Sequence, residues 1–243
     1  MTIGRRILMI MVGLSVMAGG SLAQPKTLSF KAGDTEHWAF TMDGKSIGTM
    51  DAACSAVRTG ANKQQLFDWK FSLKLNLPVQ GQQVALSMTG TYTVTDHGNP
   101  TAVSLSANVN GQAQKLSGIF SGGKAKMTIQ AGGQNMTPEV AITGKEFLAI
   151  NNIISLFSIA TRAVQVQPGK TVKAPFFAVE MMRGLDITFA AQARTETITV
   201  GGKKIECVVS DVSPIGARIH TSKATGEMLR YTMAAQKLVI ERK

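Results

Sequence analysis

The sequence predicts a mainly β protein: a single curved antiparallel sheet, a half-barrel of about a dozen strands, with one central helix packed on its concave side. Apolar and polar residues alternate along many segments, which is the period of a half-buried strand. Gly-rich and Asn-Gly-type dipeptides separate these segments. Only one stretch has both the length and the period of an amphipathic helix.

Residues 1–23 have the layout of a secretory signal peptide. Arg5 and Arg6 form a basic start, residues 7–18 are apolar, and Ser21-Leu22-Ala23 supplies small residues where a signal peptidase cuts. The apolar run is too short for a stable membrane span, although an uncleaved N-terminal anchor is the alternative. We therefore expect a periplasmic or secreted protein.

The mature chain, residues 24–243, is expected to form one domain, because no charge block, Pro-rich spacer or low-complexity run divides it. Without the two signal-peptide arginines its net charge is 24 − 15 = +9. A basic exported protein suits anionic envelope surfaces such as phospholipid head groups, and nucleic acid is not an expected partner in this compartment. Because the basic residues are spread along the whole chain, a merely lysine-rich, solvated surface is the alternative.

The first half predicts an antiparallel meander. Its clearest strand is residues 66–77, where Phe67, Trp69 and Phe71 begin a strict alternation with polar residues, so that one face is buried and the other is wet. Weaker alternation marks residues 37–42, 46–57, 82–94, 101–108, 112–121 and 124–130.

Turn chemistry supports these strands. Asp43-Gly44, Asn110-Gly111 and Gly122-Gly123 offer the positive-φ residues that short hairpin loops need. Gly48 and Gly90 fall inside strand patterns and predict bulges or bends in a strongly curved sheet.

The helix is predicted at about residues 145–164. Thr143 and Glu146 have the spacing of a capping box, and Pro168-Gly169 would stop the helix. Its apolar half contains Phe147, Ile150, Ile153, Ile154, Leu156, Phe157 and Ala160, and its polar half contains Asn151, Ser155, Ser158 and Arg162.

After the helix the strand pattern resumes, at residues 171–179, 185–200, 204–212, 217–223, 227–233 and 237–242. A long antiparallel sheet curls to hide its apolar face. The amphipathic helix is therefore expected to plug the concave side.

Residues that carry chemistry do not gather in the sequence. His37, His97 and His220 are isolated, and none has metal-ligand spacing from another ligand, so no metal or other cofactor is expected. Residues 118–124 spell G-x-x-x-x-G-K, but Ala125 replaces the hydroxyl residue of a phosphate loop and the stretch joins two strands. We therefore predict no catalytic residues and no enzyme, with an unrecognised hydrolase as the alternative.

Cys54 and Cys207 are a candidate disulfide, because an even pair of cysteines in an oxidising compartment is often bonded. Two buried free thiols that behave as small apolar side chains are the alternative. The sequence alone does not decide between them.

Several short motifs carry a family resemblance, in this order: Met42-Asp43-Gly44-Lys45-Ser46-Ile47-Gly48, an Ile-Ser-Leu helix ending in an arginine (residues 154–162), Gln167-Pro168-Gly169-Lys170, Glu196-Thr197, Gly201-Gly202-Lys203, the strand with Cys207, and Thr225-Gly226-Glu227-Met228-Leu229-Arg230. They resemble a family of exported bacterial proteins catalogued only as a domain of unknown function. More distantly, the layout is similar to the LolA-type lipoprotein carriers, in which a curved antiparallel sheet with helical cover holds acyl chains. The resemblance implies a half-barrel, implies no catalytic residues, and leaves the ligand open.

Two functions follow from this outline. The first is a non-enzymatic periplasmic protein that binds a lipid, a lipidated protein or another hydrophobic ligand in the concave face of the sheet. The lining candidates are Trp69, Phe71, Leu73, Phe147, Ile150 and Phe157. The alternative is a structural or protein-interaction module of the cell envelope, in which the same residues fill a dry core.

The signal-peptide prediction has a direct test. Protein expressed from the full sequence should lose residues 1–23 on export, so N-terminal sequencing and intact mass should both give a chain that begins at Gln24. Recovery of the full-length chain from the membrane fraction would instead support the uncleaved anchor.

Overall fold

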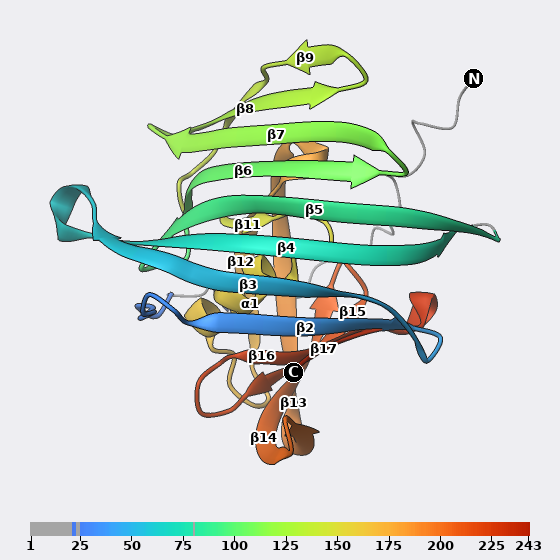
Figure 1. The fold of residues 1–243 in the computed structure, drawn as a ribbon. Coiled ribbons are helices and arrows are strands. Elements are labelled where there is room, and N and C mark those ends of the chain that lie inside the picture. The colour runs from blue at the N-terminus through green and yellow to red at the C-terminus, as the bar shows by residue number, and fades with distance from the viewer. Residues whose placement is uncertain (1–20, 23–24, 80) are drawn as a thin grey trace.

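Seventeen strands form one coiled sheet around a single α-helix in the described part of the chain (Figure 1). The structure is a computed structural model, and it describes residues 21–22, 25–79 and 81–243. The predicted signal peptide, residues 1–23, lies outside the described residues except for Ser21 and Leu22, which form β1 (Ser21–Leu22).

The first half is an antiparallel meander, as the alternation predicts. Long strands follow one another, each hydrogen-bonded to the next. They are β2 (Thr35–Met42), β3 (Lys45–Thr59), β4 (Gln65–Val79), β5 (Gln82–Thr95), β6 (Pro100–Val109), β7 (Gln112–Ser121) and β8 (Lys124–Ala131). A short 3-10 helix, η1 (Ala61–Lys63), joins β3 to β4. In Figure 1 they form the broad layer that faces the viewer.

The second half contains the remaining long strands, β12 (Thr171–Ala178), β13 (Arg183–Val200), β14 (Lys203–Ser213), β15 (Ala217–Ser222), β16 (Met228–Met233) and β17 (Leu238–Arg242). The 3-10 helices η2 (Val179–Met181) and η3 (Ala234–Gln236) lie between them. The last strand, β17, pairs antiparallel with β2, which joins both halves into one sheet. Figure 1 shows β13 running steeply behind the first layer, so the sheet coils back over its own apolar face.

Short edge strands were not predicted, and they explain why the count exceeds a dozen. They are β9 (Gln134–Met136), β10 (Glu139–Ala141) and β11 (Phe147–Ala149), together with β1. β10 pairs with β8, and β11 pairs in parallel with β12. The chain between β10 and β11 therefore spans the seam between the two sheet edges, where Phe120 of β7 also meets Phe177 of β12 with ring centroids 5.7 Å apart.

The helix is shorter than predicted. α1 spans Ile154–Val164, so the predicted start at about residue 145 is wrong. The Glu146 carboxylate does accept hydrogen bonds from the Thr143 amide and hydroxyl, at 2.7 and 2.9 Å, but this contact closes a turn that precedes strand β11. Phe147 and its neighbours form a short apolar run, whose period does not distinguish a buried strand from a buried helix. The C-terminal end agrees better: Gln165 takes the left-handed conformation just before Pro168-Gly169.

Gly48 shows why the sheet can bend where the sequence predicted it. The pairing of β2 with β3 shifts register beside this residue, between Phe40 and Thr41, as a bulge does. Its φ is +149°, and a Cβ placed there would lie 1.9 Å from the Lys74 carbonyl oxygen. Glycine therefore allows β3 and β4 to approach closely at the bend.

The two cysteines are not bonded in this structure, so of the two alternatives it has the free thiols and not the candidate disulfide. Cys54 on β3 belongs to the main core, whereas Cys207 on β14 belongs to a small separate cluster with Ile198 and Leu229. Both thiols are buried, which matches the alternative of small apolar side chains. Burial also raises the pKa of Cys207 to about 11, so little reactive thiolate forms at neutral pH.

A thiol titration tests this arrangement. The folded protein should react slowly or not at all with a thiol reagent, because both sulfurs are buried and burial raises the pKa of each thiol. Protein denatured without reductant should give two thiols per chain, and reductant should not increase that number. A denatured sample that reacts only after reduction would instead show that Cys54 and Cys207 form a disulfide.

Candidate functional site

The six residues predicted to line a ligand cavity all lie in or against the packed core. Trp69, Phe71 and Leu73 point inward from β4, and each is at most 5% exposed. Phe147 and Ile150 are also buried, and Phe157 of α1 is partly buried against the same cluster. The fold therefore brings these residues into one hydrophobic cluster, in which other apolar side chains also pack.

Aromatic contacts show how the concave side is filled. The Phe157 ring stacks on Phe176 of β12 at 5.5 Å and also contacts Phe189 and Tyr231 at 5.7 and 6.0 Å. Phe147 meets the same Phe176 ring at 5.4 Å. Rings at these separations are in contact, so α1 is pressed against the second half of the sheet.

The predicted polar face of the helix is also inside the protein. Ser155 and Ser158, which the period places on the polar half of the helix, are both 0% exposed. The Tyr92 hydroxyl on β5 donates to Ser155 Oγ at 2.9 Å, and Ser158 Oγ donates to Glu36 Oε1 at 2.9 Å. The helix is thus enclosed by both halves of the sheet, with polar contacts to the first half and aromatic contacts to the second.

Glu36 of β2 is the centre of a buried charge cluster and is 1% exposed. Its Oε1 accepts from Arg242 Nη1 at 3.3 Å and lies 3.6 Å from Arg162 Nη2. Its Oε2 accepts from Trp38 Nε1 at 3.2 Å. Including the bond from Ser158, both carboxylate oxygens have partners, as a buried charge requires.

A second carboxylate completes the cluster. Glu227 forms ion pairs with both guanidinium groups, at 3.1 Å to Arg162 Nη2 and in close contact with Arg242. Arg162 lies over the Phe30 ring at 5.3 Å, and Arg242 lies over the Trp38 ring at 5.8 Å. We call Glu36, Arg162, Glu227 and Arg242 the charged cluster.

The charged cluster forms part of the wall of a pocket of about 200 Å³, whose remaining lining is Phe30, Asp34, Thr35 and Trp69. A wider, shallow depression of about 330 Å³ is lined by Lys63, Gln64, Asp96 and His97. Both have mostly polar linings, unlike the apolar pockets that bind lipids or drug-sized ligands. Neither is the apolar cavity that the predicted lining residues would have formed.

Burial raises the pKa of Glu36 above its ordinary value, although Arg242 and Arg162 and the bonds from Ser158 and Trp38 oppose this shift. The folded protein therefore favours the neutral carboxyl more than the unfolded chain does. That contribution to stability is complete below the ordinary pKa of 4.5 and is lost as the pH rises through the folded value.

Glu196, Cys207 and His220 also come close together, on β13, β14 and β15. His220 Nε2 lies 3.2 Å from Glu196 Oε2, and the pairing register puts Cys207 opposite Glu196. The arrangement lacks an activated nucleophile, because burial raises the pKa of Cys207 to about 11. Burial likewise lowers the pKa of His220.

Among the described residues, no group of three or more His, Cys, Asp or Glu side chains could hold a metal ion. No described helix combines the length and the apolar character needed to cross a membrane.

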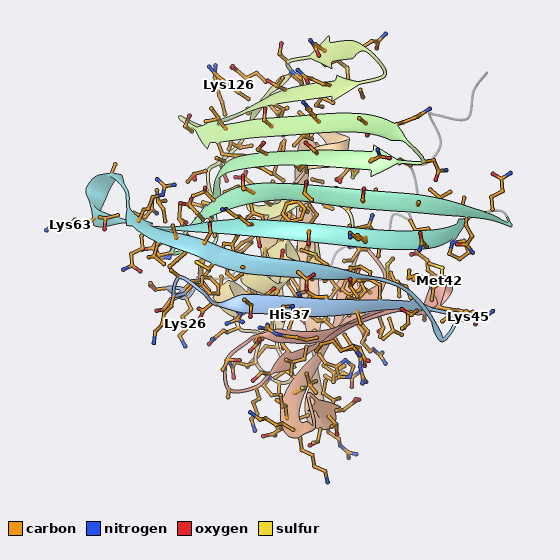
Figure 2. All side chains as sticks on the ribbon, viewed as in Figure 1. Lys26, His37, Met42, Lys45, Lys63 and Lys126 are labelled. Carbon is orange, nitrogen blue, oxygen red and sulfur yellow. The ribbon has the colours of Figure 1, made fainter. Side chains whose placement is uncertain are left out.

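The outer face of β4 to β8 carries most of its charge as lysine. Lys70 and Lys74 project from β4, Lys115 from β7, and Lys124 and Lys126 from β8. Short hydroxyl side chains stand between them, and the exposed ones include Ser87, Thr89, Thr91, Ser104, Ser106 and Ser117. We call this surface the lysine–hydroxyl face; it is turned toward the viewer in Figure 2, where Lys126 is labelled.

Comparison with known proteins supports the fold. The chain is similar to a solved beta-barrel-like protein of domain of unknown function DUF1849 from Brucella abortus, with a TM-score of 0.50 and 11% sequence identity. The match covers 87% of this chain and 95% of that one. No protein-family model and no curated protein matches the sequence. The likeness thus extends to a β-barrel-like fold of unknown function.

Sequence reasoning missed the charged cluster, but one signal was available. The alternation in β2 puts Trp38 and Phe40 on the buried face, and Glu36 has the same phase. An acidic residue in the apolar phase of a strand indicates a buried, paired carboxylate. Its partners Arg162 and Arg242 could not be found in the same way, because they come from the helix and the last strand.

The charged cluster should be important for stability. The substitution Glu36→Ala should lower the free energy of unfolding by about 3 kcal/mol, because it removes the more deeply buried of the two carboxylates that both guanidinium groups share. Chemical denaturation measures the change. The matched control is Asp51→Ala, which removes an exposed carboxylate that pairs with His37 on the outer surface and should cost no more than about 1 kcal/mol.

A conservative variant separates charge from packing. Glu36→Gln keeps a hydrogen-bonding side chain without the charge, so the wild type should lose stability relative to this variant as the pH rises from below 4.5 toward neutrality. Melting temperatures measured across this range test the sign. A wild-type advantage that instead grows with pH would show that the arginines outweigh the burial of the carboxylate.

Proposed function

We propose that this protein is a non-enzymatic module of the cell envelope that acts through its outer surface and keeps a dry core. The observation that carries the proposal is the packing of the six predicted lining residues, five of which are buried side chains of the main hydrophobic cluster. An acyl-chain carrier needs an apolar cavity at this place. Here the place is occupied by the protein's own rings.

The attachment of α1 supports the same proposal. A carrier of the LolA type would need the helix to move away from the sheet to admit a ligand. In this chain that motion would break the buried bonds of Ser155 to Tyr92 and of Ser158 to Glu36, and would separate Arg162 from both carboxylates. Each buried polar group left without a partner costs about 1–3 kcal/mol, and a charged one costs more.

Lipid binding in the concave face is the competing function. It keeps some support from Phe157, which is the least buried of the six residues, and from the seam, where only short strands cover the edges of β8 and β12. A lipidated protein would make the same demand for apolar volume. We rank both below the dry-core module because the two pockets described above are small and mainly polar.

An enzymatic function has less support still. The groups nearest to a catalytic arrangement are Glu196, Cys207 and His220, and the thiol among them has a pKa of about 11. The Glu36 carboxylate, which lines the smaller pocket, is already engaged by four partners. The first 23 residues predict export to the periplasm, where nucleic acid is not an expected partner. The envelope surface is the partner that we expect there.

Native mass spectrometry of gently purified protein tests the dry core. We expect the mass of the mature chain without a bound lipid, and no saturable binding of a fluorescent fatty acid, because side chains of the main hydrophobic cluster pack the concave side. Phe157→Ala serves as a matched variant that opens space at this position, so a fatty acid that binds the variant and not the wild type would show that this ring keeps the concave side closed. A stoichiometric lipid on the wild type would establish the carrier function instead.

A further inference from the structure

The fold gathers lysines that are dispersed in the sequence. Between residues 69 and 138 the chain contains five lysines, at positions 70, 74, 115, 124 and 126, and a single acidic residue, Asp96. Asp96 lies in the turn between β5 and β6. All five lysines are exposed and project outward, which places them on the lysine–hydroxyl face.

Few carboxylates neutralise this face. Lys124 and Lys126 share Glu139, at 2.5 and 3.5 Å. Asp68 is engaged by Arg58, so that pair adds no net charge. Within the described residues, Lys70, Lys74 and Lys115 have no ion-pair partner. The face therefore has a clear positive excess of 5 − 1 = +4, which counts Glu139 against the five lysines.

The pairing of the strands distributes these five charges over a wide area of the sheet. Lys70 and Lys74 are four residues apart on one strand, or about 13 Å. Lys115 is three strands away from them, across β5 and β6, or about 14 Å. The rows between are hydroxyls: Lys70 is followed across the sheet by Thr91, Ser104 and Ser117.

We propose that the lysine–hydroxyl face docks on the surface of an anionic phospholipid bilayer. Phosphate head groups carry negative charge and accept hydrogen bonds, and this face offers ammonium groups and hydroxyls as donors. The inference rests on the proposed envelope location, and it names the partner that the outer surface would meet. The binding is peripheral, since lysines and short polar side chains dominate the face.

The arrangement favours a bilayer over two other occupants. A small anion would contact only one or two of these lysines, because they lie far apart and neither described pocket includes them. A protein partner usually buries aromatic and large apolar side chains at the centre of its interface. On this face only Ile119, which is 61% exposed and lies near the end of β7, has that character among the described residues. Contact with all five lysines requires an extended anionic surface.

Vesicle sedimentation tests the proposal with the mature chain, residues 24–243. The protein should sediment with vesicles of phosphatidylglycerol mixed into phosphatidylcholine, should not sediment with phosphatidylcholine alone, and should be released by high salt. The triple variant Lys70→Gln, Lys74→Gln, Lys115→Gln should bind about a hundredfold more weakly, since each lysine near an anionic membrane contributes on the order of 1 kcal/mol.

The matched control lowers the net charge by the same amount at lysines outside the lysine–hydroxyl face. Lys170→Gln, Lys203→Gln, Lys204→Gln alters three exposed lysines, from the loop before β12 and the tip of the β13–β14 hairpin. It should bind almost as well as the wild type. Equal weakening by both triple variants, or binding to soluble polyphosphate but not to vesicles, would overturn the proposal. Lipid found inside the protein by native mass spectrometry would contradict the dry core instead, so the two failures are distinguishable.

Discussion

The burial of one carboxylate, that of Glu36, constrains much of this structure. A charge at 1% exposure is tolerated only where donors surround it, and here the donors come from β2, α1 and β17. The helix must therefore present Ser158 and Arg162 to the first half of the sheet, and β17 must lie beside β2 to bring Arg242 close. The pairing of the last strand with the first long strand is also what makes the sheet continuous.

The position of the helix then determines the interior. Once one side of α1 is held by Glu36 and Tyr92, its other side faces β12 and β13, where Phe157 meets Phe176 and Phe189. A helix with polar groups on one side and rings on the other can be buried completely if each side finds its matching surface. Both sides do so here, and the concave side of the sheet becomes core. The polar stripe is therefore an attachment site between layers.

The sequence predicted the strands well and the helix less well, for physical reasons. Alternation is a local property, so β4 could be recognised from Phe67 and Trp69 and their polar neighbours. Whether Phe147 belongs to a helix or a strand depends on β12, which follows far along the chain and offers Phe176 as a parallel partner. The depth of Ser155 and Ser158 depends likewise on distant residues. The six lining candidates belong to or pack against one hydrophobic cluster, but periodicity cannot measure the volume left between side chains.

The segregation of charge follows from the same topology. The meander from β4 to β8 places consecutive segments side by side, so a stretch of sequence that is poor in acids becomes a continuous surface that is poor in acids. The lysines in that stretch need no local clustering in the sequence to form a positive face. In the sequence, Lys70 and Lys115 are far apart and resemble ordinary solvated lysines. In the folded sheet, only β5 and β6 lie between the strands that carry them. The packed core and the positive excess of this outer face are the two observations on which the proposed recognition at the outside of the sheet rests.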